Sequence, residues 1–272
     1  MVLAHERLVG DGEPEQWMLF LHGILGRRAN WRSFARKLLA KRPGWGAVLV
    51  DLRDHGESQG LSGERTVAAA GADLVGLVSE IERDSARVAG ILGHSFGGKV
   101  AIAGAAELRA SGCPLDELWI IDAPPGPRPE TREPLTAQVF AALGGLPDRF
   151  ASRTAFVEAL GAAGISKMTA QWLATNLVGS NESGWVFGLD LAKLRLLIAD
   201  FLVVDTWPIL EVEARLGCAV NLVVAERSDA VSGSERERAE AANAAGTITL
   251  HEVPRAGHWV HVENPAGLLE VF

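Results

Sequence analysis

The chain has 272 residues, 48% of them apolar, which is enough to bury one large core without disulfide or metal staples. Its 26 basic and 34 acidic side chains give a formal net charge of −8 with no long single-sign run, so we expect no nucleic-acid partner. The N-terminus lacks a signal-peptide pattern and no run of 18 apolar residues occurs, so we expect no export signal and no membrane span.

Short apolar runs alternate with longer helical patterns, which is typical of a parallel sheet wrapped by helices. Most runs are rich in Val, Ile and Leu without alternation, as expected for strands covered on both faces. The predicted strands span residues 17–21, 47–51, 88–92, 118–122, 220–225 and 247–253. Helical patterns between them include residues 31–41, 67–82 and 99–110. The fold class is therefore α/β.

The alternation is interrupted between residues 124 and 216. This interval opens with four prolines within residues 124–129 and then shows helical patterns at 139–143, 156–160, 169–177 and 189–198. We predict a helical cap insert at 124–216, placed over the C-terminal edge of a core formed by residues 1–123 and 217–272. Its large apolar side chains either line an acyl pocket or form the core of the insert: Phe140, Phe150, Trp172 and Phe201.

The strongest motif is Gly-His-Ser-Phe-Gly-Gly at residues 93–98, between a predicted strand and a predicted helix. A G-x-S-x-G motif in this context forms a sharp turn that exposes a nucleophilic serine. Small neighbours allow the strand and helix to approach closely, and the helix N-terminus favours developing negative charge. Ser95 is therefore the predicted nucleophile.

Acyl transfer also requires peptide N–H groups that stabilise an oxyanion. In this fold class one donor is the residue after the nucleophile, here Phe96. The loop after the strand at 17–21 provides the other, which we assign to Ile24. We expect His22, at the start of this loop, to brace it.

His258 is the favoured general base because it follows the last predicted strand, and the base comes last in the chain order of this fold. The acid has two candidates. Asp122 ends the strand after the nucleophile helix, whereas Asp229 follows the next strand. In an Asp-x-x-Val pattern ending at Val231 the acid position holds Ser228, so we favour Asp122 and keep Asp229 as the alternative.

The segment Asp51-Leu-Arg-Asp-His55-Gly-Glu-Ser58 clusters carboxylates around a histidine. Because it follows a strand directly, we interpret it as a turn braced by an Asp/Arg network. We predict no metal site and no cofactor. The two cysteines, Cys113 and Cys218, fit no paired framework and suggest reduced thiols in a cytoplasmic protein.

Together these motifs resemble the α/β-hydrolase superfamily over nearly the whole chain. The segments 20–26, 93–99, 122–124 and 257–261 look like an esterase branch that includes small bacterial acyl-CoA esterases and α/β-hydrolase-domain proteins of mitochondria and plastids. The resemblance implies a mostly parallel eight-stranded sheet, a helical cap, and esterase or thioesterase activity. In that branch the acid follows the earlier strand, which supports Asp122.

The predicted function is hydrolysis of small esters or thioesters through an acyl-enzyme on Ser95. The alternatives are a C–C bond hydrolase, a lyase or a cofactor-free perhydrolase with the same triad, and a ligand receptor or scaffold with vestigial turnover. Dehalogenase and epoxide hydrolase chemistry is disfavoured because it requires a carboxylate where Ser95 stands. The sequence does not predict the natural acyl donor or the oligomeric state.

Overall fold

A computed structural model describes residues 2–128, 134–180 and 182–272. Its main sheet has seven strands in the order β1-β3-β2-β4-β5-β8-β9, and only β1 runs antiparallel to its neighbour. Their bounds are His5–Val9 (β1), Gln16–Leu21 (β2), Trp45–Val50 (β3), Val88–His94 (β4), Glu117–Ile121 (β5), Ala219–Ala225 (β8) and Thr249–Val253 (β9).

The expected count of eight strands is wrong for the main sheet. The six predicted strands are all present, and β1 adds a seventh at the edge next to β3. The two other strands of the described chain, Leu177–Ser180 (β6) and Gly184–Phe187 (β7), pair only with each other in a separate hairpin. They therefore cannot extend the main sheet.

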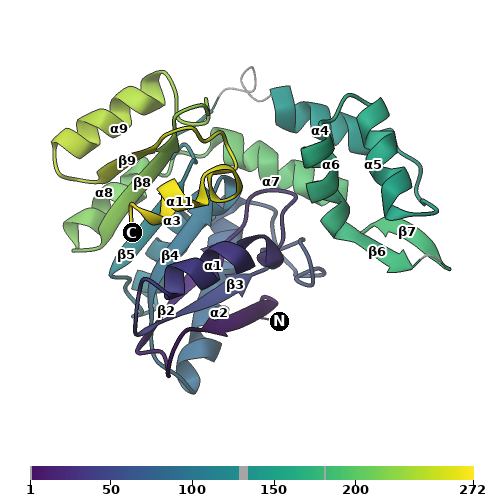
Figure 1. The fold of residues 1–272 in the computed structure, drawn as a ribbon. Helices are drawn as coiled ribbons and strands as arrows, with labels where there is room; N and C mark the ends of the chain where they lie inside the picture. The colour runs from purple at the N-terminus through teal and green to yellow at the C-terminus, as the bar shows by residue number, and fades with distance from the viewer. Residues whose placement is uncertain (1, 129–133, 181) are drawn as a thin grey trace.

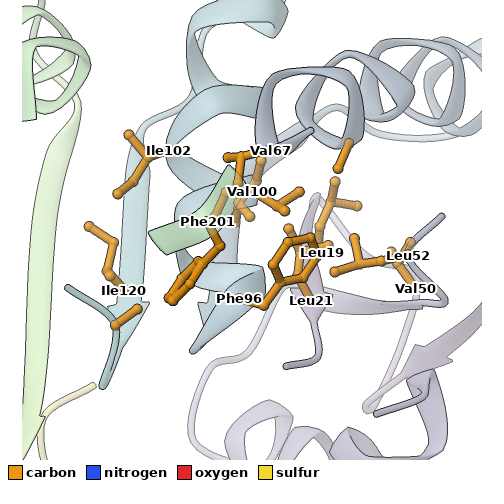
Figure 2. Close-up of a cluster of buried hydrophobic side chains, with 14 of the residues drawn as sticks. Leu19, Leu21, Val50, Leu52, Val67, Phe96, Val100, Ile102, Ile120 and Phe201 are labelled. Atoms are coloured by element: carbon orange, nitrogen blue, oxygen red, sulfur yellow. The ribbon is translucent and has the colours of Figure 1, made fainter. Parts of the chain in front are cut away.

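Helices cover both faces of this sheet because successive strand residues point to opposite sides. On β2, Leu19 and Leu21 pack in a core shared with helices α2, α3 and α8, whereas Met18 and Phe20 face a second core against α1 and α11. Figure 2 shows part of the first core. These helices span Arg32–Leu39 (α1), Val67–Arg83 (α2), Phe96–Ala110 (α3), Trp207–Arg215 (α8) and Pro265–Leu269 (α11).

The elements between β5 and α8 form a lobe beside one end of the sheet (Figure 1). They are Pro134–Gly144 (α4), Arg153–Ala162 (α5), Lys167–Leu173 (α6), Ala174–Asn176 (η3), the β6–β7 hairpin and Leu191–Val203 (α7). The next helix, α8, already contacts α3 and β8. The remaining helices are Arg28–Trp31 (η1), Ser234–Ala244 (α9) and Val260–Glu263 (α10).

None of the helices in the described ranges combines the length and the apolar composition that crossing a bilayer requires.

Candidate active site

Ser95 occupies the turn between β4 and α3, where its backbone adopts φ 52° and ψ −119°. This left-handed conformation is uncommon for a residue with a side chain and is typical of functional turns. The glycines around it are required by contact. A Cβ on Gly97 would lie 2.5 Å from the carbonyl oxygen of His22, and one on Gly93 would collide with the backbone of Gly97. The motif thus allows β4, α3 and the loop after β2 to meet at Ser95.

Asp122 and His258 form a hydrogen-bonded pair although 136 residues separate them in sequence. Nδ1 of His258 donates to Oδ2 of Asp122 at 2.7 Å. With the proton on Nδ1, the other ring nitrogen, Nε2, is left as the basic one. His258 follows β9, and its side chain is 38% exposed, whereas that of Asp122 is 1% exposed. His258 and Ser95 line the same cavity.

The Asp122 carboxylate accepts two further hydrogen bonds. The amide of Ala225 donates to Oδ1 at 3.1 Å, and the hydroxyl of Ser228 donates to Oδ2 at 2.5 Å. Three donors therefore hold this buried carboxylate in place. In sequence, Ser228 stands out only as the residue in the usual acid position, and its contact with Asp122 was not predicted.

The alternative acid, Asp229, lies elsewhere. Its side chain is 80% exposed and pairs with Arg128 at 3.5 Å, and within the described residues it makes no hydrogen bond to His258. Asp229 lines the cavity wall without contacting the imidazole.

The two amides assigned to the oxyanion hole come from adjacent segments. Phe96 begins α3, and Ile24 lies in the loop after β2. Within the described chain, neither amide donates a hydrogen bond to another protein group. Free N–H groups beside a nucleophile are the donors that an oxyanion requires.

Two histidines brace the loop that contains Ile24. The amide of Leu25 donates to Nε2 of His55, and the amide of Leu52 donates to Nε2 of His22, both at 3.1 Å. Nδ1 of each ring donates to a backbone carbonyl, that of Gly23 for His22 at 2.8 Å and that of Arg53 for His55 at 2.9 Å. The loop after β2 and the loop after β3 are therefore tied together, because each accepts an amide hydrogen from the other through a histidine ring.

Both rings must be neutral to accept these amide hydrogens. Burial lowers the pKa of His55 to about 3, with a smaller contribution from the neighbouring His22, and burial also lowers the pKa of His22. The buried Asp51 carboxylate accepts from the amide of Arg28 at 2.7 Å and from its guanidinium. The 51–58 segment thus braces the loop that contains Ile24.

His94, next to Ser95, has a buried ring whose Nε2 donates to the carbonyl of His258 at 2.8 Å. Burial holds the pKa of His94 well below its usual value, and the nearby His258 and His261 add to this effect. The neutral ring therefore positions the backbone that carries the base.

The cavity beside Ser95 has a volume of about 270 Å³. Apolar side chains from the lobe and from the segment after β9 line much of it: Leu135, Val139, Met168, Trp172, Ile198, Trp259 and Val262. Of the aromatic residues considered for an acyl pocket, Trp172 lines the cavity, whereas Phe140, Phe150 and Phe201 are buried in the core. The site suits a small molecule with an apolar portion.

Comparison with known proteins identifies the family of this chain. The model of the "Alpha/beta hydrolase family" matches residues 18–271. The chain belongs to that family. This hydrolase is 25% identical to the mouse sn-1-specific diacylglycerol lipase ABHD11, over 98% of the chain and 83% of the relative. It is 24% identical to 2-succinyl-6-hydroxy-2,4-cyclohexadiene-1-carboxylate synthase of Serratia proteamaculans, over 95% and 92%.

Among solved structures, the hydrolase resembles a marine microorganism esterase with a TM-score of 0.80 and 20% identity, covering 99% of this chain and 97% of the esterase. At this identity the match shows a shared fold.

Proposed function

We propose that this hydrolase cleaves ester or thioester bonds of small acyl substrates through an acyl-enzyme on Ser95. The observation that carries the proposal is the Asp122–His258 hydrogen bond, made beside the cavity that Ser95 also lines. A hydroxyl nucleophile, a neutral imidazole and an orienting carboxylate are the three groups of serine-hydrolase chemistry. The free thiols of Cys113 and Cys218 are compatible with a cytoplasmic location.

The reaction has two steps. Ser95 attacks the acyl carbon while Nε2 of His258 takes the hydroxyl proton, and the amides of Ile24 and Phe96 stabilise the oxyanion. His258 then protonates the departing alcohol or thiol. In the second step His258 removes a proton from water, the hydroxide attacks the acyl-enzyme, and Ser95 regains its proton as the acid leaves. Asp122 accepts from Nδ1 of His258 and orients the imidazolium.

The test combines covalent labelling with turnover. A fluorophosphonate probe should label Ser95 rapidly, and Ser95→Ala should abolish both labelling and hydrolysis of a short p-nitrophenyl ester while the variant stays folded. Rapid turnover by Ser95→Ala would remove this serine from the mechanism. An inert Ser95 in a chain that binds a ligand tightly would favour a receptor instead.

The acid is tested by a matched pair of variants. Asp122→Asn should reduce kcat by about 10⁴, the loss typical when the group that orients the imidazole is neutralised. Asp229→Asn should leave kcat within about twofold, because its 80% exposed side chain makes no hydrogen bond to His258 within the described residues. A kcat loss confined to Asp229→Asn would reverse the assignment.

The Serratia relative supports a second candidate, because its name describes a carboxylate synthase rather than an esterase. The same triad would then act as a lyase or a C–C bond hydrolase. A panel of acyl esters and acyl-CoA thioesters of graded length separates the two. Turnover of several panel members supports acyl transfer, and labelling of Ser95 without turnover of any of them supports the second candidate.

A further inference from the structure

Lys99 lies one helical turn after Ser95, in the first turn of α3, and is fully buried. Its ammonium donates to three main-chain carbonyls: Gly126 at 2.8 Å, Phe201 at 2.6 Å and Val204 at 2.8 Å. An ammonium removed from water requires such partners, because desolvation of an unpaired charge is very unfavourable. The three carbonyls therefore surround and stabilise the Lys99 ammonium.

The three acceptors belong to the two ends of the lobe between β5 and α8, which lies within the predicted insert at 124–216. Gly126 follows β5, where the chain leaves the sheet, and the other two carbonyls lie at the end of α7, before the chain enters α8. The two ends also bond to each other. The amide of Arg128 donates to the carbonyl of Leu202 at 2.7 Å, and the amide and hydroxyl of Thr206 donate to that of Pro125 at 2.8 and 2.7 Å. We call these two paired segments, residues 124–128 and 200–206, the junction. Lys99 ties the junction to α3, the helix that follows Ser95.

This junction lies next to the catalytic segment. The ring of Phe201 has its centroid 4.6 Å from Nζ of Lys99 and 6.1 Å from the ring of Phe96, whose amide is assigned to the oxyanion hole. Both phenylalanines belong to the core in Figure 2. Helices α4, α6 and α7, which supply cavity residues, all lie between the two ends. A shift of the junction would therefore move the substrate-binding wall relative to Ser95.

We propose that Lys99 is a positioning residue that fixes the insert over Ser95 and so maintains the substrate-binding cavity. This role rests on the proposed acyl-transfer function. It predicts that loss of the ammonium weakens substrate binding more than it slows the chemical step. A purely structural lysine would lower stability without separating KM from kcat.

The experiment compares Lys99→Met with Lys193→Met. Methionine has a similar length but no donor. Lys193 lies on α7, and its half-exposed ammonium pairs with the carboxylates of Asp190 and Asp54, which makes it a matched control on the same insert. If the competent arrangement falls to a tenth of the population, KM of Lys99→Met for a p-nitrophenyl ester rises about tenfold, with kcat within about twofold. The control should retain the KM of the parent chain.

Hydrogen exchange provides a readout that does not depend on turnover. In Lys99→Met, amides in segments 124–128 and 200–206 should exchange faster while those of β2 and β4 keep their protection. An unchanged KM in folded Lys99→Met, or faster exchange spread equally over the sheet, would overturn the proposal. If the parent chain resists the fluorophosphonate probe, the acyl-transfer function fails, and exchange alone still decides whether Lys99 holds the junction.

Should Lys99→Met fail to fold, Thr206→Val takes its place. It keeps the shape of the side chain and removes the hydroxyl bond to Pro125. Local exchange should rise in the same two segments, with a KM increase of about threefold for a partial loss of the competent population. Parent-like exchange and KM in this variant would refute the link between the junction and substrate binding.

Discussion

The His55 ring offers a direct test of how the loop that contains Ile24 is held in place. Its Nε2 accepts from the amide of Leu25, and its Nδ1 donates to the carbonyl of Arg53. Two substitutions separate these bonds. His55→Gln keeps an oxygen at the distance of Nε2 from the backbone, whereas His55→Asn reaches only the position of Nδ1. Asparagine therefore leaves the Leu25 amide without an acceptor beside Ile24.

The expected magnitudes follow from burial. His55 is 0% exposed, so an unsatisfied Leu25 amide costs about 1–3 kcal/mol. For a chain of this size each kcal/mol lowers Tm by about 2–4 °C. If the Ile24 amide moves away from the oxyanion, kcat falls by about 10²–10³, the loss typical of one missing donor. KM should change little, because this bond forms only in the transition state.

The assay measures kcat, KM and Tm for both variants with a p-nitrophenyl ester. His55→Asn should lose kcat and stability together, and His55→Gln should recover a substantial part of kcat. If His55→Asn lowers Tm by the expected amount and keeps the parent kcat, the ring stabilises the fold without positioning the oxyanion donor, and the reasoning is refuted.

Three further perturbations test the site. Ser228→Ala removes a charge-assisted bond to Asp122 worth about 1.5–3 kcal/mol, so kcat should fall about tenfold or more; an unchanged kcat would make that bond irrelevant to orientation. Gly97→Ala should abolish both labelling and a cooperative melt, because its Cβ would lie 2.5 Å from a backbone oxygen; a folded, active variant would contradict the elbow geometry. The free energy of unfolding should decrease as pH falls from 6.5 toward 3, because burial lowers the pKa of His55 to about 3 while the unfolded chain takes up the proton near 6.5. His55 contributes up to about 1.4 kcal/mol per pH unit, and His94 acts in the same direction; urea midpoints that stay constant from pH 7 to pH 4.5 would contradict this.

Five of the six predicted strands were predictable because they are mostly buried and consist largely of apolar residues. The sixth, β9, is a partly exposed edge strand that includes Thr249, His251 and Glu252. The seventh, β1, was not predicted, because it is a short edge strand with polar residues and partial exposure. The exposed β6–β7 hairpin was missed for the same reason. Apolar runs reveal burial, and these strands are held by backbone pairing more than by burial.

Candidate site residues were predictable where a motif carries its own geometry. The elbow motif around Ser95 is local in sequence, although Gly97 makes room for the backbone of His22 and Gly98 for the side chain of Ala123. The bond of Ser228 to Asp122 spans 106 residues, and the Lys99 bonds span 27, 102 and 105. Such contacts depend on how loops meet at the sheet edge, which no local pattern specifies. The choice between Asp122 and Asp229 illustrates this. The side chain of Ser228 bonds to Asp122, whereas that of the next residue, Asp229, is 80% exposed.

In the proposed mechanism, the reacting groups are separate from the groups that select the substrate. Hydrogen bonds fix the loop that contains Ile24 to the loop after β3. They also fix Asp122 to β8 and His258 to Asp122. Much of the apolar cavity wall comes from α4, α6 and α7, which are joined to the core through the junction at Lys99. Changes in those helices can therefore alter which small molecule fits in the cavity without disturbing Ser95. Because a cavity wall carried on a separate segment must still be placed accurately against Ser95, a rigid junction on the nucleophile helix itself is the feature that such a design requires.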